Sequence, residues 1–87
     1  MNLSEEQLKV IEDMGRLYYT PKLIAINLEI DQHEFEMIIK SETGPAFNAY
    51  MKGWFDSDMK LRNATLQAAI NGSTPSIQMI ENYKAQQ

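Results

Sequence analysis

The chain has 87 residues, a formal net charge of −4 and no cysteine. A chain of this length forms one small domain that buries only about 60 to 65% of the surface its unfolded form exposes, so we expect a partner to cover more of it. The absence of cysteine excludes disulfides and thiolate metal sites, and neither a long apolar run nor a secretory leader is present, so we expect a soluble, cytoplasmic protein without a membrane span.

The negative charge is concentrated in the first half of the chain. Residues 1–44 carry nine acids and four bases, whereas residues 45–87 carry three acids and four bases. Five of the eight bases follow an acid by four residues, the spacing of a helical ion pair: Glu5 with Lys9, Glu12 with Arg16, Glu36 with Lys40, Asp56 with Lys60, and Asp58 with Arg62. Such pairing leaves little free positive charge for phosphate groups.

The first predicted helix runs from about Glu5 to Leu17. Ser4 followed by Gln7 has the pattern of a capping box, and Leu3 is placed to pack on Leu8. The apolar positions repeat at helical spacing. We expect this helix to pack on the next two as part of a three-helix bundle.

Two short helices follow in the segment Tyr19 to Lys40. Thr20 and Pro21 are typical of a helix start, so we predict a second helix to about Leu28. Asp31 is placed to cap a third helix from Gln32 to about Ser41. This order of parts is the outline of a helix-turn-helix.

Ala25 is the small residue expected where the two helices of this unit approach most closely. The large apolar residues around it are Ile24, Leu28, Ile30, Phe35 and Ile38. Glu29 stands at the turn position where glycine usually supplies a positive backbone angle. The turn is therefore strained, differently shaped or lengthened.

The segment Ser41 to Pro45 contains the strongest helix-ending signal, and we place the boundary between residues 1–44 and 45–87 there. Residues 46–71 read as one long helix or as two helices with a bend near Gly53. Asn71, Gly72 and Ser73 end this stretch, and Thr74 with Pro75 opens a short terminal helix. The predicted fold is all-α: an N-terminal three-helix bundle, a long helix and a short C-terminal helix.

The long helix has too wide an apolar arc for one narrow seam. We expect the bundle to cover part of it and a second protein surface to cover the rest. The candidate interface residues are Phe47, Tyr50, Met51, Trp54, Phe55 and Met59.

These segments in this order resemble the small terminase subunit of tailed phages, and above all its short helix-turn-helix relatives from prophages. The similar stretches are Thr20 to Ile39, Ala49 to Gly53, and Leu66 to Ser76. The resemblance implies a homo-oligomer that recognises viral double-stranded DNA and delivers it to the large terminase subunit for packaging. The chain departs from the family pattern in Glu29 and in its acidic recognition helix.

The second helix of a helix-turn-helix presents its N-terminal outer positions to the major groove. Here these positions are Asp31, Gln32, His33, Glu36 and Met37. Gln32 could pair with adenine, and His33 could donate to a base or a phosphate. Lys22 and Lys40 are candidate phosphate contacts, and Met37 completes the candidate DNA-binding set.

The same residues admit another interpretation, in which they are solvated positions on a structural helix. The acidic surface would then meet a basic protein, and the chain would be a helical interaction module that does not read DNA. His33 and Glu36 lie one turn apart but lack a third metal ligand. No pattern of catalytic residues or cofactor site is present, so we predict neither a metal nor an enzyme.

Overall fold

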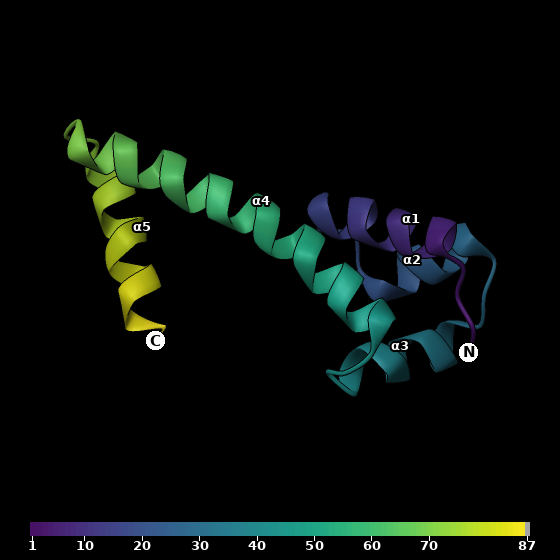
Figure 1. The fold of residues 1–87 in the computed structure, drawn as a ribbon. Helices are drawn as coiled ribbons and strands as arrows, with labels where there is room; N and C mark the ends of the chain where they lie inside the picture. Colours follow the sequence, from purple (N-terminus) through teal and green to yellow (C-terminus); the bar gives the residue numbers. More distant parts are fainter. Residues whose placement is uncertain (87) are drawn as a thin grey trace. The chain divides into compact units, whose positions relative to one another are not determined.

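The computed structural model describes residues 1–86, and within them the only regular elements are α-helices. They are α1 (Glu5–Arg16), α2 (Pro21–Leu28), α3 (Gln32–Lys40), α4 (Pro45–Ile70) and α5 (Thr74–Ala85) (Figure 1). The predicted all-α fold is confirmed. The chain divides into two compact units, one spanning Met1–Ser57 and the other beginning at Asp58, and α4 contributes to both.

The first three helices begin at the side-chain caps expected from the sequence. The Ser4 hydroxyl accepts from the Gln7 amide at 3.1 Å, and the Gln7 side chain accepts from the Ser4 amide at 2.8 Å, which completes the capping box. Thr20 and Asp31 cap α2 and α3 in the same way, through the amides of Leu23 and Glu34. These caps fix where each helix starts.

The turn between α2 and α3 is the strained alternative among those expected. Glu29 has φ 57° and ψ 42°, in the left-handed region. Its amide donates to the Ile26 carbonyl, and the Ile30 amide donates to the Ala25 carbonyl at 3.1 Å. This pair of bonds is a Schellman ending with glutamate in place of glycine, which costs roughly 1–2 kcal/mol of conformational energy.

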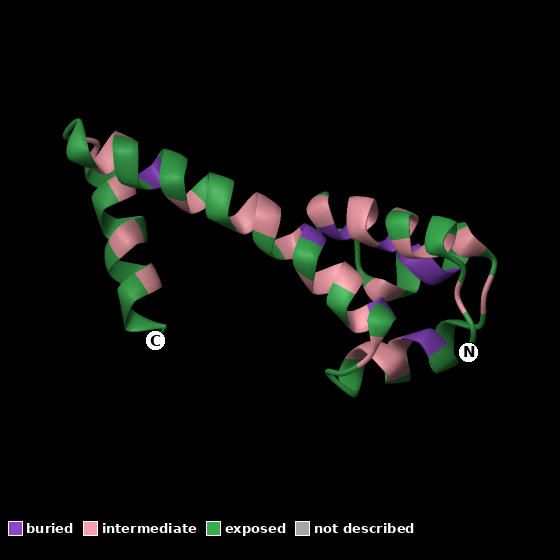
Figure 2. Ribbon diagram, in the orientation of Figure 1, coloured by how far each residue is buried: buried purple, intermediate pink, exposed green. Residues whose placement is uncertain are grey.

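The core of the N-terminal unit forms around Ala25, as predicted. The buried apolar residues are Ile11, Ile24, Ala25, Phe35 and Ala46, from all four helices of this unit (Figure 2). Leu28, Ile30 and Ile38 are half-buried and pack against them. The bundle is therefore built from α1, α2, α3 and the first part of α4, and not from three helices alone.

Gly53 explains why the first part of α4 belongs to the N-terminal unit. A Cβ atom added at Gly53 would lie 1.9 Å from the Glu12 carbonyl oxygen and 2.8 Å from the Arg16 amide nitrogen of α1. Glycine therefore permits close packing of α4 on α1. Of the two predicted alternatives for this stretch, the structure has the single helix, and α4 is continuous over 26 residues. The compact N-terminal unit extends to Ser57. Gly53 and Asp56 of α4 contact α1, and Ala46, Ala49 and Tyr50 belong to the core or pack against it.

The second unit consists of the C-terminal part of α4 and α5, with a turn at Gly72, whose φ is 94°. Thr65 is its one buried residue among those described, and no large apolar side chain in it is buried. Within residues 1–86, no helix combines the length and apolar character needed to cross a membrane.

Candidate nucleic-acid interface

The N-terminal half of α3 presents the predicted DNA-reading side chains to solvent. Gln32 and His33 are exposed, and Met37 on the next turn is 53% exposed. Phe35, between them in the sequence, points to the core and is fully buried. The alternation follows from the helical period, so one face of α3 holds the helix in place and the other is free for contacts.

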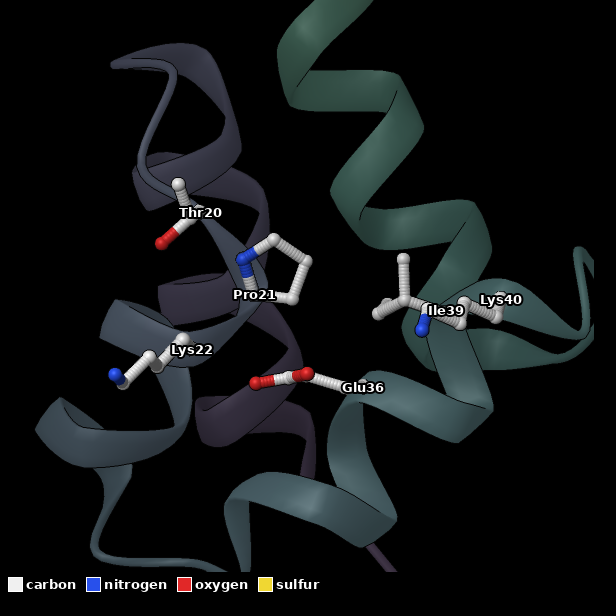
Figure 3. Close-up of a pocket in the computed structure, with 6 residues that line it drawn as sticks. All are labelled: Thr20, Pro21, Lys22, Glu36, Ile39 and Lys40. Atoms are coloured by element: carbon white, nitrogen blue, oxygen red, sulfur yellow. The ribbon is translucent and has the colours of Figure 1, made fainter.

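A shallow groove brings the two candidate phosphate contacts into one site. It has a volume of about 430 Å³ and lies between the start of α2 and the end of α3. Its lining residues are Thr20, Pro21, Lys22, Glu36, Ile39 and Lys40 (Figure 3). Lys22 and Lys40, eighteen positions apart in the sequence, therefore flank one surface.

The lysines at this groove are free of ion pairs among the residues that the structure describes. The expected pair of Glu36 with Lys40 is not formed, and Lys22 has no carboxylate partner. Figure 3 shows the Glu36 side chain reaching from α3 toward α2 across the groove. The groove thus combines two cations with one anion.

Two of the acids on α3 are engaged in local contacts. The Asp31 carboxylate accepts from the Glu34 amide at 2.6 Å as the helix cap. A Glu34 carboxylate oxygen lies 3.7 Å from the amino terminus of Met1. Both contacts offset part of the negative charge that the sequence places on this helix, and Glu36 is the acid that lines the groove.

The Arg16 guanidinium is paired with three carboxylates and is therefore not available to bind phosphate. Its guanidinium donates to Glu12 at 2.8 Å, Asp13 at 2.8 Å and Asp56 at 2.9 Å. The hydrogen bonds from Arg16 lower the pKa of the Glu12 and Asp13 carboxyls, and the three acids raise the pKa of Arg16. The sequence predicted only the contact with Glu12, since Asp56 is forty residues away.

Lys9 and Lys52 join the same cluster. Lys9 lies 3.6 Å from Glu12 and 3.3 Å from Asp13, and not on the expected partner Glu5. Lys52 lies 3.7 Å from Glu12. The predicted pair of Asp58 with Arg62 is confirmed at 2.8 Å. Lys9, Arg16 and Lys52 of the N-terminal unit therefore form ion pairs with carboxylates of the same chain.

The candidate interface residues of α4 fall into two groups. Phe47, Met51 and Trp54 are half-buried, as is Tyr50, which packs against the core and donates its hydroxyl to the Tyr19 carbonyl at 3.2 Å. Burial raises the pKa of Tyr50. Phe55 and Met59 are 52% and 67% exposed. Only these last two are available in large part for a partner.

Aromatic side chains surround Trp54 on the surface of the N-terminal unit. Tyr18 meets it edge-on with ring centroids 5.6 Å apart, and Phe55 does so at 5.5 Å. Tyr18 has φ 62°, in the left-handed region. The sequence indicated Trp54 and Phe55 but not Tyr18, whose position depends on the turn after α1.

An exposed apolar face on α2 was not predicted. Leu23 is 46% and Ile26 49% exposed, on the side opposite the buried Ile24 and Ala25. The signal was present in the sequence PKLIAINL, which is apolar on both sides of the helix. Such a face suits a protein contact better than a phosphate contact.

No group of three or more His, Asp or Glu side chains in residues 1–86 is arranged to hold a metal ion. The comparisons with protein-family models, curated proteins and solved structures give no match to this chain. Function must therefore be argued from the geometry of its own residues.

Proposed function

We propose that this chain is a helix-turn-helix DNA-binding protein of the small terminase type, which inserts α3 into the major groove of viral double-stranded DNA and acts as an oligomer in packaging. One observation carries the DNA-binding part. Gln32, His33 and Met37 occupy the outer face of α3, while the groove between α2 and α3 is flanked by two lysines that have no ion pair within residues 1–86. The packaging role and the large terminase subunit as partner are supported by the resemblance described above.

Each candidate residue has a distinct part in this proposal. The Gln32 side chain can form a bidentate pair with adenine, in which its amide nitrogen donates to N7 and its amide oxygen accepts from the N6 amino group. His33 can donate to a base acceptor or a phosphate oxygen, and Met37 can contact a thymine methyl. Lys22 and Lys40 would position the protein by binding phosphates.

The electrostatics predict weak binding by one copy. Each neutralised phosphate contributes a slope of about −0.9 to the dependence of log affinity on log salt, so two lysines give a slope of only about −2. Glu36 opposes the phosphates at the same groove. Several copies on one DNA molecule would raise the overall affinity by about a hundredfold or more through avidity.

Binding to duplex DNA from the phage packaging region tests the proposal. We expect Gln32→Ala with His33→Ala to lower the affinity about tenfold or more, since a good bidentate base contact contributes about 1–3 kcal/mol. Lys22→Ala and Lys40→Ala should each reduce the salt slope by about one. Fluorescence anisotropy over a salt series measures both effects.

Gln78→Ala is the matched control, because Gln78 is an exposed glutamine on α5, outside this surface. It should leave affinity and slope unchanged. The DNA-binding proposal is wrong if the native protein fails to bind duplex DNA even at low salt, or if the Gln32 and His33 changes have no larger effect than Gln78→Ala.

The alternative function is a helical protein-interaction module with an acidic surface. The observation that favours it is the apolar face of Leu23 and Ile26, next to Lys22 on α2. Under this alternative, the native chain captures a basic protein partner and does not bind DNA. The double change Leu23→Ser with Ile26→Ser would abolish capture of the partner.

A further inference from the structure

The turn between α4 and α5 contains the one asparagine of the chain that is followed by glycine. The six asparagines of the sequence precede Leu3, Leu28, Ala49, Ala64, Gly72 and Tyr83. An asparagine side chain can react with the backbone nitrogen of the next residue, and a side chain on that next residue hinders the approach. Glycine has no side chain, so Asn71 with Gly72 is the pair in this chain that reacts most easily.

The surroundings of this pair leave the reacting groups accessible. Asn71 and Gly72 are both exposed, and a Cβ atom added at Gly72 would meet nothing within 4 Å. The Asn71 side chain forms no hydrogen bond within residues 1–86. Its amide group is therefore free to turn toward the backbone, and water reaches the same place.

Backbone hydrogen bonds close the turn at the end of α4. The Gly72 amide donates to the Ala69 carbonyl at 3.0 Å. The Ser73 amide donates to the Ala68 carbonyl at the same distance. With Gly72 at φ 94°, this is a Schellman ending in which glycine holds the left-handed position. The bond of the Gly72 amide must open before its nitrogen can attack Asn71.

The unit that contains this turn has few contacts that keep the turn closed. Thr65 is the one buried residue from Asp58 to Gln86, and no large apolar side chain of that stretch is buried. Segments with few buried apolar contacts open locally at a small cost in free energy. The buried core of the protein lies in the N-terminal unit. Opening of the turn therefore does not require that core to unfold.

We propose that Asn71 is a site of spontaneous deamidation. The Gly72 nitrogen attacks the side-chain carbonyl carbon of Asn71, so that a bond from this nitrogen to Cγ forms while the bond from Cγ to Nδ2 breaks. The proton of the Gly72 amide leaves with Nδ2, ammonia departs, and a succinimide ring remains. Water then opens the ring. Attack of water at Cγ gives aspartate, and attack at the main-chain carbonyl gives isoaspartate, in which the chain continues through the former side chain.

Both products change the end of α4. Each adds a negative charge to a chain whose formal net charge is already −4. The last turn of α4 has no basic residue, so the new carboxylate stands at the negative end of the helix dipole without compensation. Isoaspartate also inserts a carbon atom into the backbone before Gly72, which shifts the donors of the Schellman bonds away from their acceptors. Isoaspartate is therefore the product that opens the turn.

Peptide mapping of the aged full chain by liquid chromatography and mass spectrometry tests the proposal. We expect progressive loss of the Asn71 amide at physiological temperature and neutral pH, with the aspartate and isoaspartate forms of the same peptide appearing as separate peaks. Urea below the unfolding transition should speed this loss, since the turn opens more often. An unchanged rate in urea would show that opening of the turn is not required.

Asn48 is the matched internal control, since it is also exposed on α4 but precedes Ala49. It should keep its amide in the same samples. The change Asn71→Gln should abolish formation of the acidic species, because glutamine would have to close a larger ring. The proposal is wrong if Asn71 keeps its amide as long as Asn48 does, or if the Asn71→Gln variant becomes acidic at the native rate.

The effect on the turn has a readout of its own. Hydrogen exchange at the Ser73 amide should be faster in the isoaspartate form, purified by ion exchange, than in the unmodified chain. Equal exchange in the two forms would overturn the predicted opening of the turn. Neither measurement uses DNA or the number of subunits, so failure here does not bear on the proposed function.

Discussion

Arg16 shows how one side chain can join two distant parts of the chain. Its guanidinium contacts Glu12 and Asp13 on its own helix and Asp56 on α4. Ser57, next to Asp56, donates its hydroxyl to the Arg16 carbonyl. These contacts hold α4 against the end of α1, and those of the Arg16 guanidinium depend on the carboxylates being ionised.

Acidification should therefore weaken the fold. The pKa values of Glu12 and Asp13 lie below their ordinary values of 4.5 and 3.8 in the folded protein. The folded state thus binds fewer protons than the unfolded state, and stability is fully present above pH 4.5 and is lost as pH falls through the lowered values. Denaturant unfolding at a series of pH values should show this loss.

The change Arg16→Gln should flatten the dependence of folding stability on pH, because it removes the hydrogen bonds that lower the pKa values of Glu12 and Asp13. It should also lower the stability at neutral pH. Lys84→Gln is the control, since Lys84 and Glu81 form an exposed pair at 3.5 Å. An unchanged pH profile in Arg16→Gln would show that the cluster contributes nothing to acid sensitivity.

At the scale of the element, α2 and α3 combine strong start signals with a costly connection. Thr20, Pro21 and Asp31 set the helix starts, whereas Glu29 adopts a conformation that glycine adopts more easily. The hydrogen bonds of Glu29 and Ile30 close the turn despite this cost. The buried contacts of Ile24, Ala25 and Phe35 offset it.

The closest approach between elements is at Gly53, where α4 meets α1. We expect Gly53→Ala to lower the free energy of unfolding by on the order of 2 kcal/mol, because the added methyl group would meet the Glu12 backbone and force the helices apart. Helix propensity alone predicts the opposite sign, a gain of about 1 kcal/mol. Urea denaturation decides between them.

Asn48→Ala, at an exposed position of α4, provides the comparison for Gly53→Ala. It should be neutral or raise stability by about half a kcal/mol through helix propensity. A gain in stability from Gly53→Ala would mean that the two helices do not pack as closely as described.

At the scale of the whole molecule, burial is divided unequally between the two units. The N-terminal unit contains Ile11, Ile24 and Phe35 as fully buried large side chains, and the unit from Asp58 onward contains none among its described residues. The N-terminal unit carries the candidate DNA surface. No residue from Asp58 to Gln86 lines the groove of that surface.

Self-association should make stability depend on protein concentration. A partner that binds only the folded state stabilises it by mass action. The thermal midpoint of the native protein should therefore rise with concentration, by a few degrees over a large dilution range. A native midpoint independent of concentration would contradict the oligomer of the proposed function.

The sequence alone determined the first three helices and their starts. Ser4, Thr20 and Asp31 act through bonds to residues three positions away. The spacing of Ile24 and Leu28 on α2 follows from the helical period. Local spacing is sufficient for such features. It was sufficient also for the exposure of Gln32, His33 and Met37 on α3.

Only the tertiary structure decided which distant residues meet. Asp56 on Arg16, Gly53 against Glu12, and Lys22 with Lys40 at one groove each join segments whose separation in sequence carries no periodic signal. The same contacts join the first part of α4 to the compact unit that spans Met1–Ser57. Helical spacing fixes which side of a helix a residue occupies, and packing between helices decides what that side touches.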